Sequence, residues 1–199
     1  MVPQQFYNLR EIFMPHIHSK DSITIDHLDK REDTFITSED SVTIDSRKDK
    51  IEVDGNLSVK AEKYVNLIGN GSVSDDTDSI IYAMELSETT LELYEYNKQF
   101  GPSILYAKAF FNIKGKGFSI NHGIVASKGP VNIEASSMKL SYSIIASSES
   151  IYLKGVQDFE CKYSIIESPI VYMNYGESAY DEYCTFLGEV KFVDDDFVI

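Results

Sequence analysis

Three aspartates within a stretch of four residues are the first candidates for chemistry in this chain. Asp75, Asp76 and Asp78 stand in the segment GSVSDDTDS, and carboxylate oxygens gathered in one loop are the ligands that Ca²⁺ prefers. An acidic surface loop that holds no ion is the simpler interpretation, and we favour it. Calcium is therefore the only cofactor that we consider, and we expect none.

Two histidines and two cysteines are the other candidate ligands. His16 and His18 alternate on one side of an extended segment, but no cysteine or further histidine follows at a zinc-finger spacing. Cys161 and Cys184 are 23 residues apart, close to one unit of the repeat described below. Stacked repeats would bring their Cα atoms within disulfide range, but two buried, reduced thiols are the interpretation we favour.

A repeat of about 20 residues organises the elements that carry these groups. Apolar residues recur in pairs two positions apart, which is the spacing of a β-strand with one buried side. The pairs at this period are Leu91/Leu93, Phe111/Ile113, Val131/Ile133, Ile151/Leu153 and Val171/Met173. Weaker pairs continue the pattern to Ile23/Ile25 on one side and to Val190/Phe192 on the other.

Further strands complete each repeat. Short apolar segments begin at Ile80, Ile104, Ile124, Ile144 and Ile165, one before each pair, and small or turn-prone residues separate them. Three short strands per unit predict an all-β fold, a single-stranded parallel β-helix (β-solenoid) of about nine coils. We expect residues 1–20 to form an N-terminal cap or partner segment, and residues 21–199 to form the solenoid domain with a C-terminal cap from about 177. Such caps protect the open ends of a solenoid.

A column of outward side chains is the candidate binding surface. The residues between the inward pairs include Glu92, Asn112, Asn132, Tyr152 and Tyr172, which the repeat places one above another. Asn112, Asn132, Tyr152 and Tyr172 are the residues of this column that a partner would contact, because adjacent aromatic rings anchor interfaces or stack on sugars. The alternative is that a terminal segment of the same chain packs over the two tyrosines, and we favour this alternative.

Charge and hydropathy narrow the classes of partner. The net charge of −14, without a long basic patch, argues against binding nucleic acid through its phosphates. No apolar run approaches the length of about 18 residues that a transmembrane helix needs, so we expect no membrane insertion. The first residues lack the pattern of a signal peptide, so we expect either a cytoplasmic protein or an exported one whose signal has been removed, for example at a bacterial or phage surface.

Two neighbouring runs of the sequence resemble the repeats of filamentous-haemagglutinin-type bacterial adhesins. They are SIIASSESIYLKGVQDFECKYSIIES and GIVASKGPVNIEASSMKLSYSIIAS. The resemblance covers about residues 80–176 and concerns the architecture of the coil. Bactofilin-like solenoids, which form polymers, are a second resemblance. Both imply a parallel β-helix, and neither supplies catalytic residues.

The expected function is a non-enzymatic structural or adhesive module that mediates protein–protein assembly, with a protein partner or a second copy of itself. We recognise no phosphate-binding loop, nucleophile elbow or helix-borne metal motif in the chain. The alternative is a carbohydrate-binding or carbohydrate-active β-helix of a phage tail or secreted protein. A lyase or hydrolase would need carboxylates that converge on one groove, and among the outward positions of the repeat only Glu92 is acidic.

Overall fold

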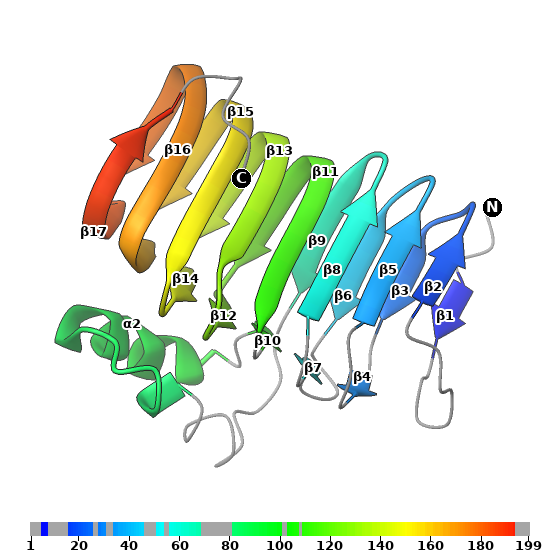
Figure 1. Ribbon diagram of the computed structural model, residues 1–199, viewed down its shortest axis with the longest axis horizontal. Helices are drawn as coiled ribbons and strands as arrows, with labels where there is room; N and C mark the ends of the chain where they lie inside the picture. Colours follow the sequence, from blue (N-terminus) through cyan, green and yellow to red (C-terminus); the bar gives the residue numbers. More distant parts are fainter. Residues whose placement is uncertain are drawn as a thin grey trace.

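The chain winds into a parallel β-solenoid of about seven turns, with about 20 residues in each turn, in the computed structural model (Figure 1). The structure describes residues 5–7, 16–25, 28–30, 34–45, 51–53, 56–68, 81–100, 103–107 and 109–193. All strand pairings in these ranges are parallel. This confirms the fold class and the length of the repeat that the sequence predicts.

Three faces form the cross-section of the coil. Face A contains β2 (His16–Ser19), β5 (Thr34–Ser38), β8 (Asn56–Ala61) and the first parts of β11 (Phe110–Asn121), β13 (Val131–Ser141) and β15 (Ser150–Lys162). Face B contains β1 (Gln5–Tyr7), β3 (Ile23–Ile25), β6 (Val42–Asp45), β9 (Tyr64–Ile68) and the later parts of the same long strands. Face C contains β4 (Leu28–Lys30), β7 (Ile51–Val53), β10 (Ser103–Ala107), β12 (Gly123–Ser127) and β14 (Ile144–Ser147). The strand β16 (Ile165–Glu182) starts on face C, crosses face A and ends on face B. The strand β17 (Thr185–Phe192) starts on face C and continues onto face A.

Aliphatic side chains stack inside the coil as the repeat predicts. Phe111, Val131, Ile151 and Val171 are in register on successive turns, and none of them is exposed to solvent. Burying one such side chain contributes about 1.5–3 kcal/mol to the free energy of unfolding. The continuous core therefore accounts for much of the stability of the rod.

The expected number of coils, about nine, is too high, and one of the predicted repeats is not a coil. Leu91 and Leu93 lie in the helix α2 (Glu88–Lys98) rather than in a strand, and Glu92 does not belong to the outward column. The segment from Ile80, also predicted as a strand, forms helical turns at residues 81–85. Ser87 caps α2 by accepting a hydrogen bond from the backbone N–H of Thr90, so the local sequence favours a helix.

The helix α2 covers face C of the solenoid, beside β12 and β14 (Figure 1). Ile124, Ile144 and the alanines Ala126 and Ala146 point outward from these strands, and they are buried against Ile81, Met84 and Tyr94 of the segment 81–100. The strands β12 and β14 are therefore buried on both sides. This second apolar core explains why the chain leaves the coil after β9 and returns at β10.

Hydrogen bonds to two distant parts of the coil fix the ends of α2. At its N-terminus the Glu167 carboxylate accepts from the Ser87 backbone N–H at 2.8 Å and from the Ser87 hydroxyl at 3.1 Å. Near its C-terminus the buried Asn97 side chain donates to the Tyr142 backbone carbonyl at 2.8 Å. Both ends of α2 are thus held against the coil.

Strand pairing continues into both of the segments that we expected to act as caps. The strands β1 and β2, which lie within residues 1–20, pair with β3 and β5. At the other end β17 pairs with β16 as a further turn. The described parts of both segments therefore take part in the strand pairing of the solenoid.

A disulfide joins Cys161 to Cys184, so the expectation of two reduced thiols is wrong. Adjacent turns of the solenoid stack one strand spacing apart, and the two Cα atoms are 5.6 Å from each other. Cys161 is completely buried in the core on β15, and Cys184 stands at the corner before β17. The bond therefore ties the last described turn to the turn below it.

Candidate functional site

The four predicted partner-binding residues lie in one outward column on face A. Strand register places Asn112 beside Asn132, Asn132 beside Tyr152, and Tyr152 beside Tyr172. The Asn132 side chain donates to the Asn112 carbonyl oxygen at 2.8 Å, and Asn112 donates to the Ser58 hydroxyl at 3.1 Å. The sequence therefore predicts the geometry of this column correctly, with Ser58 in the place expected for Glu92.

The tyrosines of this column cover one another. The rings of Tyr152 and Tyr172 are 4.7 Å apart between centroids and inclined by only 7°, and both residues are half-buried. The ammonium group of Lys191 lies 6.0 Å from the centre of the Tyr172 ring. A sugar stacks on the open face of an aromatic ring, and the facing sides of this pair are occupied. The column therefore offers ring edges and hydroxyl groups rather than a stacking platform.

The other predicted ligands are three aspartates and two histidines. Asp75, Asp76 and Asp78 lie outside the described residues. His16 stacks on Phe35, and the His18 ring is 2.9 Å from the Thr37 hydroxyl. Within the ranges that the structure describes, no group of three or more His, Cys, Asp or Glu side chains could hold a metal ion. In the same ranges no helix is long and apolar enough to cross a membrane.

A second aromatic column, which the repeat analysis missed, runs along the corner between faces B and C. His122, Tyr142, Tyr163 and Tyr183 occupy this corner on four successive turns. Their rings stack with centroid distances of 5.0, 5.0 and 5.1 Å and interplanar angles of 9°, 12° and 15°. Phe100, just after α2, extends the stack beyond His122 at 5.1 Å. We call these five residues the corner ladder.

The backbone of the corner ladder is strained at each turn. His122, Tyr142, Tyr163 and Tyr183 have positive φ angles of 49°, 48°, 47° and 60°, in the left-handed region that glycine and asparagine usually occupy. Each such residue costs on the order of 1 kcal/mol, and a conformation of this kind is kept only where the surroundings enforce it. Ring stacking between turns offsets part of this cost.

Exposed aromatic surface is concentrated at this corner. Tyr163 and Phe100 are 42% and 44% exposed, and Tyr183 is 71% exposed. Tyr96 of α2 is 42% exposed and contacts the ladder at both Phe100 and Tyr142, with centroid distances of 5.0 and 6.1 Å. These four residues are more than half of the seven large apolar side chains that are exposed in the described part of the chain.

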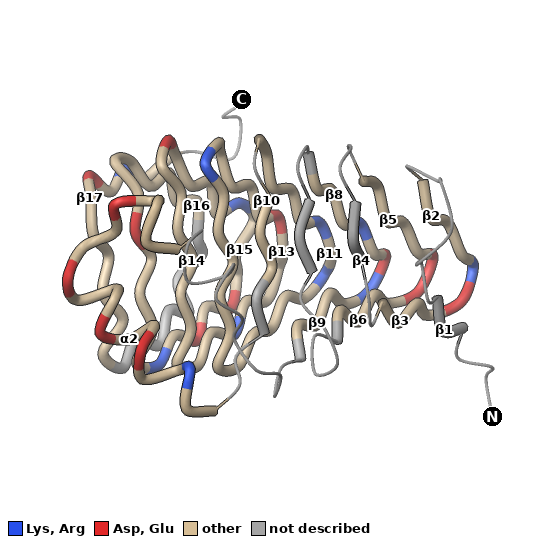
Figure 2. Tube along the Cα trace, turned by 90° about the horizontal axis from the view of Figure 1, so that it is seen from below, with Lys and Arg blue, Asp and Glu red and all other residues tan. Residues whose placement is uncertain are grey.

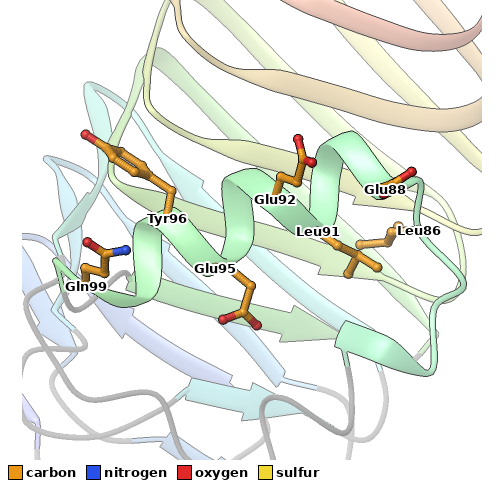
Figure 3. A pocket seen from close by; sticks show the side chains of 7 residues that line it. All are labelled: Leu86, Glu88, Leu91, Glu92, Glu95, Tyr96 and Gln99. Atoms are coloured by element: carbon orange, nitrogen blue, oxygen red, sulfur yellow. The ribbon is translucent and has the colours of Figure 1, made fainter.

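Charged side chains lie on the faces on both sides of the corner ladder. On the face C flank, Glu88 and Glu92 lie on the same side of α2 as Tyr96, as expected for residues spaced by four along a helix (Figure 3). Both glutamates are exposed. Leu86, Leu91 and Glu95 line an open groove with them, and the acidic residues of α2 stand out along the side of the rod in Figure 2.

On the face B flank, two lysines share one glutamate. Glu160 lies 3.1 Å from the Lys139 ammonium group and 3.2 Å from that of Lys162. Hydrogen bonds from Lys139 and then Lys162 hold the pKa of Glu160 below its ordinary value. Strand register places Glu182 of β16 beside Lys162, so these four residues carry no net charge together.

The sequence contains a signal for the corner ladder. His122, Tyr142, Tyr163 and Tyr183 are spaced by 20, 21 and 20 residues, which is the period of the apolar pairs. Each of the first three is followed by Gly123, Ser143 or Ser164, small residues that begin the next strand or the turn before it. A search for aromatic residues at this period would have found the column, whereas we followed only aliphatic pairs.

Comparison of the chain with models of known protein families, with curated proteins and with solved structures found no match. The proposed function therefore rests on the geometry of the molecule.

Proposed function

We propose that this chain is a non-enzymatic, rod-like module that assembles with protein partners along its corner ladder. The observation that carries this proposal is the concentration of exposed aromatic side chains on one edge of a rod that is otherwise polar and acidic. Contiguous apolar surface on a soluble protein is typical of an interaction site, and tyrosine is enriched among the residues that dominate binding energy. A stacked, rigid row of rings also loses little conformational entropy on binding.

The architecture fits a structural or adhesive role. Stacked turns give a stiff spacer whose side-chain columns repeat at a fixed interval. The resemblance to filamentous-haemagglutinin-type repeats and to bactofilin-like solenoids supports the same role. A disulfide persists in an oxidising compartment, and we therefore infer that the module works outside a reducing cytosol.

The column through Asn112, Asn132, Tyr152 and Tyr172 is the second candidate for the binding surface. Its rings are parallel and half-buried, so the column would present ring edges and hydroxyl groups to a protein. Carbohydrate binding, the alternative function, receives less support from these tyrosines because their facing sides are occupied.

Site-specific photo-crosslinking tests the proposal. Tyr163 is replaced by benzoylphenylalanine, the protein is produced in the cells from which it comes, and adducts are identified by mass spectrometry after irradiation. We expect polypeptide adducts at this position. The same replacement at Tyr172 tests the second column, and replacement at Tyr64, which is 55% exposed and outside both columns, is the control.

Adducts at position 163 that exceed those at position 64 support assembly along the corner ladder. If position 172 gives adducts and position 163 gives none, the binding surface is the face A column instead. The proposal fails if no polypeptide is crosslinked at position 163 or 172, or if position 64 reacts equally well.

A further inference from the structure

We infer that the protein partner of the corner ladder contributes a basic segment, which crosses face C along the outer side of α2 and places a lysine or arginine side chain in a cleft at the other end of the helix. This inference rests on the proposed function and names the chemistry of the partner. It follows from the path of α2, from the charges along this path and from a buried hydroxyl group in the wall of the cleft.

The helix α2 lies across face C, from the edge shared with face A to the corner ladder. Its N-cap, Ser87, bonds to Glu167, where β16 passes from face C to face A. Near its other end Asn97 bonds to Tyr142 of the ladder. Tyr96 lies on the outer side of α2 and contacts two rings of the ladder, so this side of the helix continues into the proposed interface.

The outer side of α2 is an open groove with apolar and acidic walls. Two half-buried leucines, Leu86 and Leu91, line it. Its charged residues are three exposed glutamates, Glu88, Glu92 and Glu95 (Figure 3). Grooves of this kind receive peptide segments through apolar anchors, and complementary charge selects among such segments. The groove therefore suits a segment that combines basic and apolar side chains.

A cleft of about 490 Å³ continues the groove beyond the first turn of α2, and Leu86 lines both. Met84 and Leu187 add to its apolar wall, and its charged residues are Glu85 and Glu167. A long cationic side chain buries its aliphatic stem against apolar residues while its charged end stays beside the carboxylates. The cleft therefore fits the side chain of a lysine or an arginine.

The wall of the cleft includes a buried hydroxyl group. Ser168 is only 3% exposed, and its Oγ atom has no hydrogen-bond partner in the described part of the chain. One turn earlier, the corresponding Ser147 donates to the Gly129 carbonyl at 2.9 Å and accepts from the backbone N–H of Glu149. A buried polar group without a partner lowers stability. The N–H groups of lysine or arginine supply the donor that the Ser168 oxygen can accept.

Three glutamates on this path lack the lysine partners that acidic residues have elsewhere on the rod. Among the described residues, Glu85, Glu88 and Glu92 take part in no ion pair. Glu134 and Glu160, in contrast, pair with lysines at 2.5–3.2 Å. The net charge of −14 also favours a basic partner. A second copy of this acidic chain would oppose these charges and fits less well.

Selection of peptides on the full-length chain tests this inference. A library of random peptides displayed on phage is selected on the immobilised chain, and the selected peptides are synthesised with a fluorescent label for anisotropy titrations. We expect lysine and arginine to be enriched over the unselected library, together with apolar residues. Binding should weaken as the salt concentration rises, because salt screens the attraction between exposed charges.

Two variants locate the bound peptide. Glu88→Lys with Glu92→Lys reverses charge in the groove, and Ala83→Trp fills the cleft from an exposed position in its wall without changing charge. We expect each variant to bind the selected peptides at least about tenfold more weakly than the parent. A peptide whose basic residues are replaced by glutamate should bind the charge-reversed variant and not the parent. A variant that had lost its fold would show no such recovery.

A matched control separates the groove from the overall charge of the chain. Glu62→Lys with Asp158→Lys changes the net charge as much as the groove variant does, at two exposed positions outside the groove, the cleft and the ladder. The control should bind the peptides like the parent. The inference fails if the control weakens binding equally, if folded groove and cleft variants bind like the parent, or if the selected peptides are not enriched in basic residues.

Photo-crosslinking at position 163 distinguishes this inference from the proposed function. In the protein with Glu88→Lys and Glu92→Lys, we expect fewer polypeptide adducts at this position than in the parent. Adducts that persist unchanged in that protein would refute the basic segment and leave the proposed function standing. If the parent forms no adduct at position 163 or 172, the proposed function fails and this inference fails with it.

Discussion

His122 is the one histidine of the corner ladder. Burial lowers the pKa of His122, since desolvation disfavours the charged imidazolium. The unfolded chain then binds more protons than the folded one once the pH falls below the ordinary value of 6.5. Stability is therefore retained above this value and declines as the pH falls toward the pKa of the folded state.

Replacing His122 by tyrosine should remove this dependence. Tyrosine already occupies the equivalent position in the next three turns, so we expect the ring stack to accept it. We expect the loss of melting temperature between about pH 7.5 and 5.5 to be smaller in the variant than in the parent. Thermal melts at both pH values measure this, and the prediction is wrong if the two proteins lose the same amount. The other histidines of the chain are present in both proteins and contribute equally to the pH dependence of each.

At the scale of single elements, the disulfide secures the turn that contains β17. This turn pairs on one side only, with β16, among the described strands, and its inward residues Phe186 and Val190 are only partly buried. A covalent bond to the completely buried Cys161 therefore holds an element that packing alone secures weakly.

Reduction of the disulfide should loosen β17 before the rest of the rod. For a closed loop of this length the chain-entropy model gives a loss of about 3 kcal/mol in the free energy of unfolding. We expect a lower urea midpoint, together with faster amide hydrogen exchange in residues 185–192 than in β13. The variant Cys161→Ala with Cys184→Ala should be insensitive to reductant. Unchanged exchange in β17 after reduction would contradict the prediction.

At the scale of the whole molecule, stability is shared along one continuous core. Ile133 is completely buried and lies between Ile113 and Leu153 on the neighbouring turns. The variant Ile133→Asp would place an unpaired carboxylate in this stack. Either burial of the charge or protonation of the carboxylate to avoid it would lower the free energy of unfolding by several kcal/mol.

We expect Ile133→Asp to unfold the solenoid cooperatively, whereas Ser136→Asp, which adds the same charge at an exposed position of the same strand, should not. Circular dichroism melts of the two variants and the parent provide the measurement. A soluble Ile133→Asp protein with the spectrum and melting temperature of the parent would show that the register is different.

The solenoid itself could be predicted because its causes are local and repeated. Alternation of apolar residues fixes which side chains point inward, and the period of about 20 residues fixes which of them stack. Pairs such as Val131/Ile133 and Ile151/Leu153 occupy the positions expected, and so does the column from Asn112 to Tyr172. The corner ladder has the same period, so it too could have been predicted from the sequence.

The helix α2 and the disulfide depend on contacts between residues far apart in the sequence. Alternation in the segment around Leu91 suits a strand as well as a helix. Burial of Tyr94 against Ile124 and Ile144 favours the helix, and so do the hydrogen bonds that the ends of the helix donate to Glu167 and Tyr142. The pairing of Cys161 with Cys184 likewise required the two turns to stack with both sulfur atoms at one corner. The periodicity of the sequence determines the coil. Where the chain leaves the coil, and which segment covers its outer surface, depend on contacts that exist only once the coil has folded, because the contacting residues are far apart in the sequence.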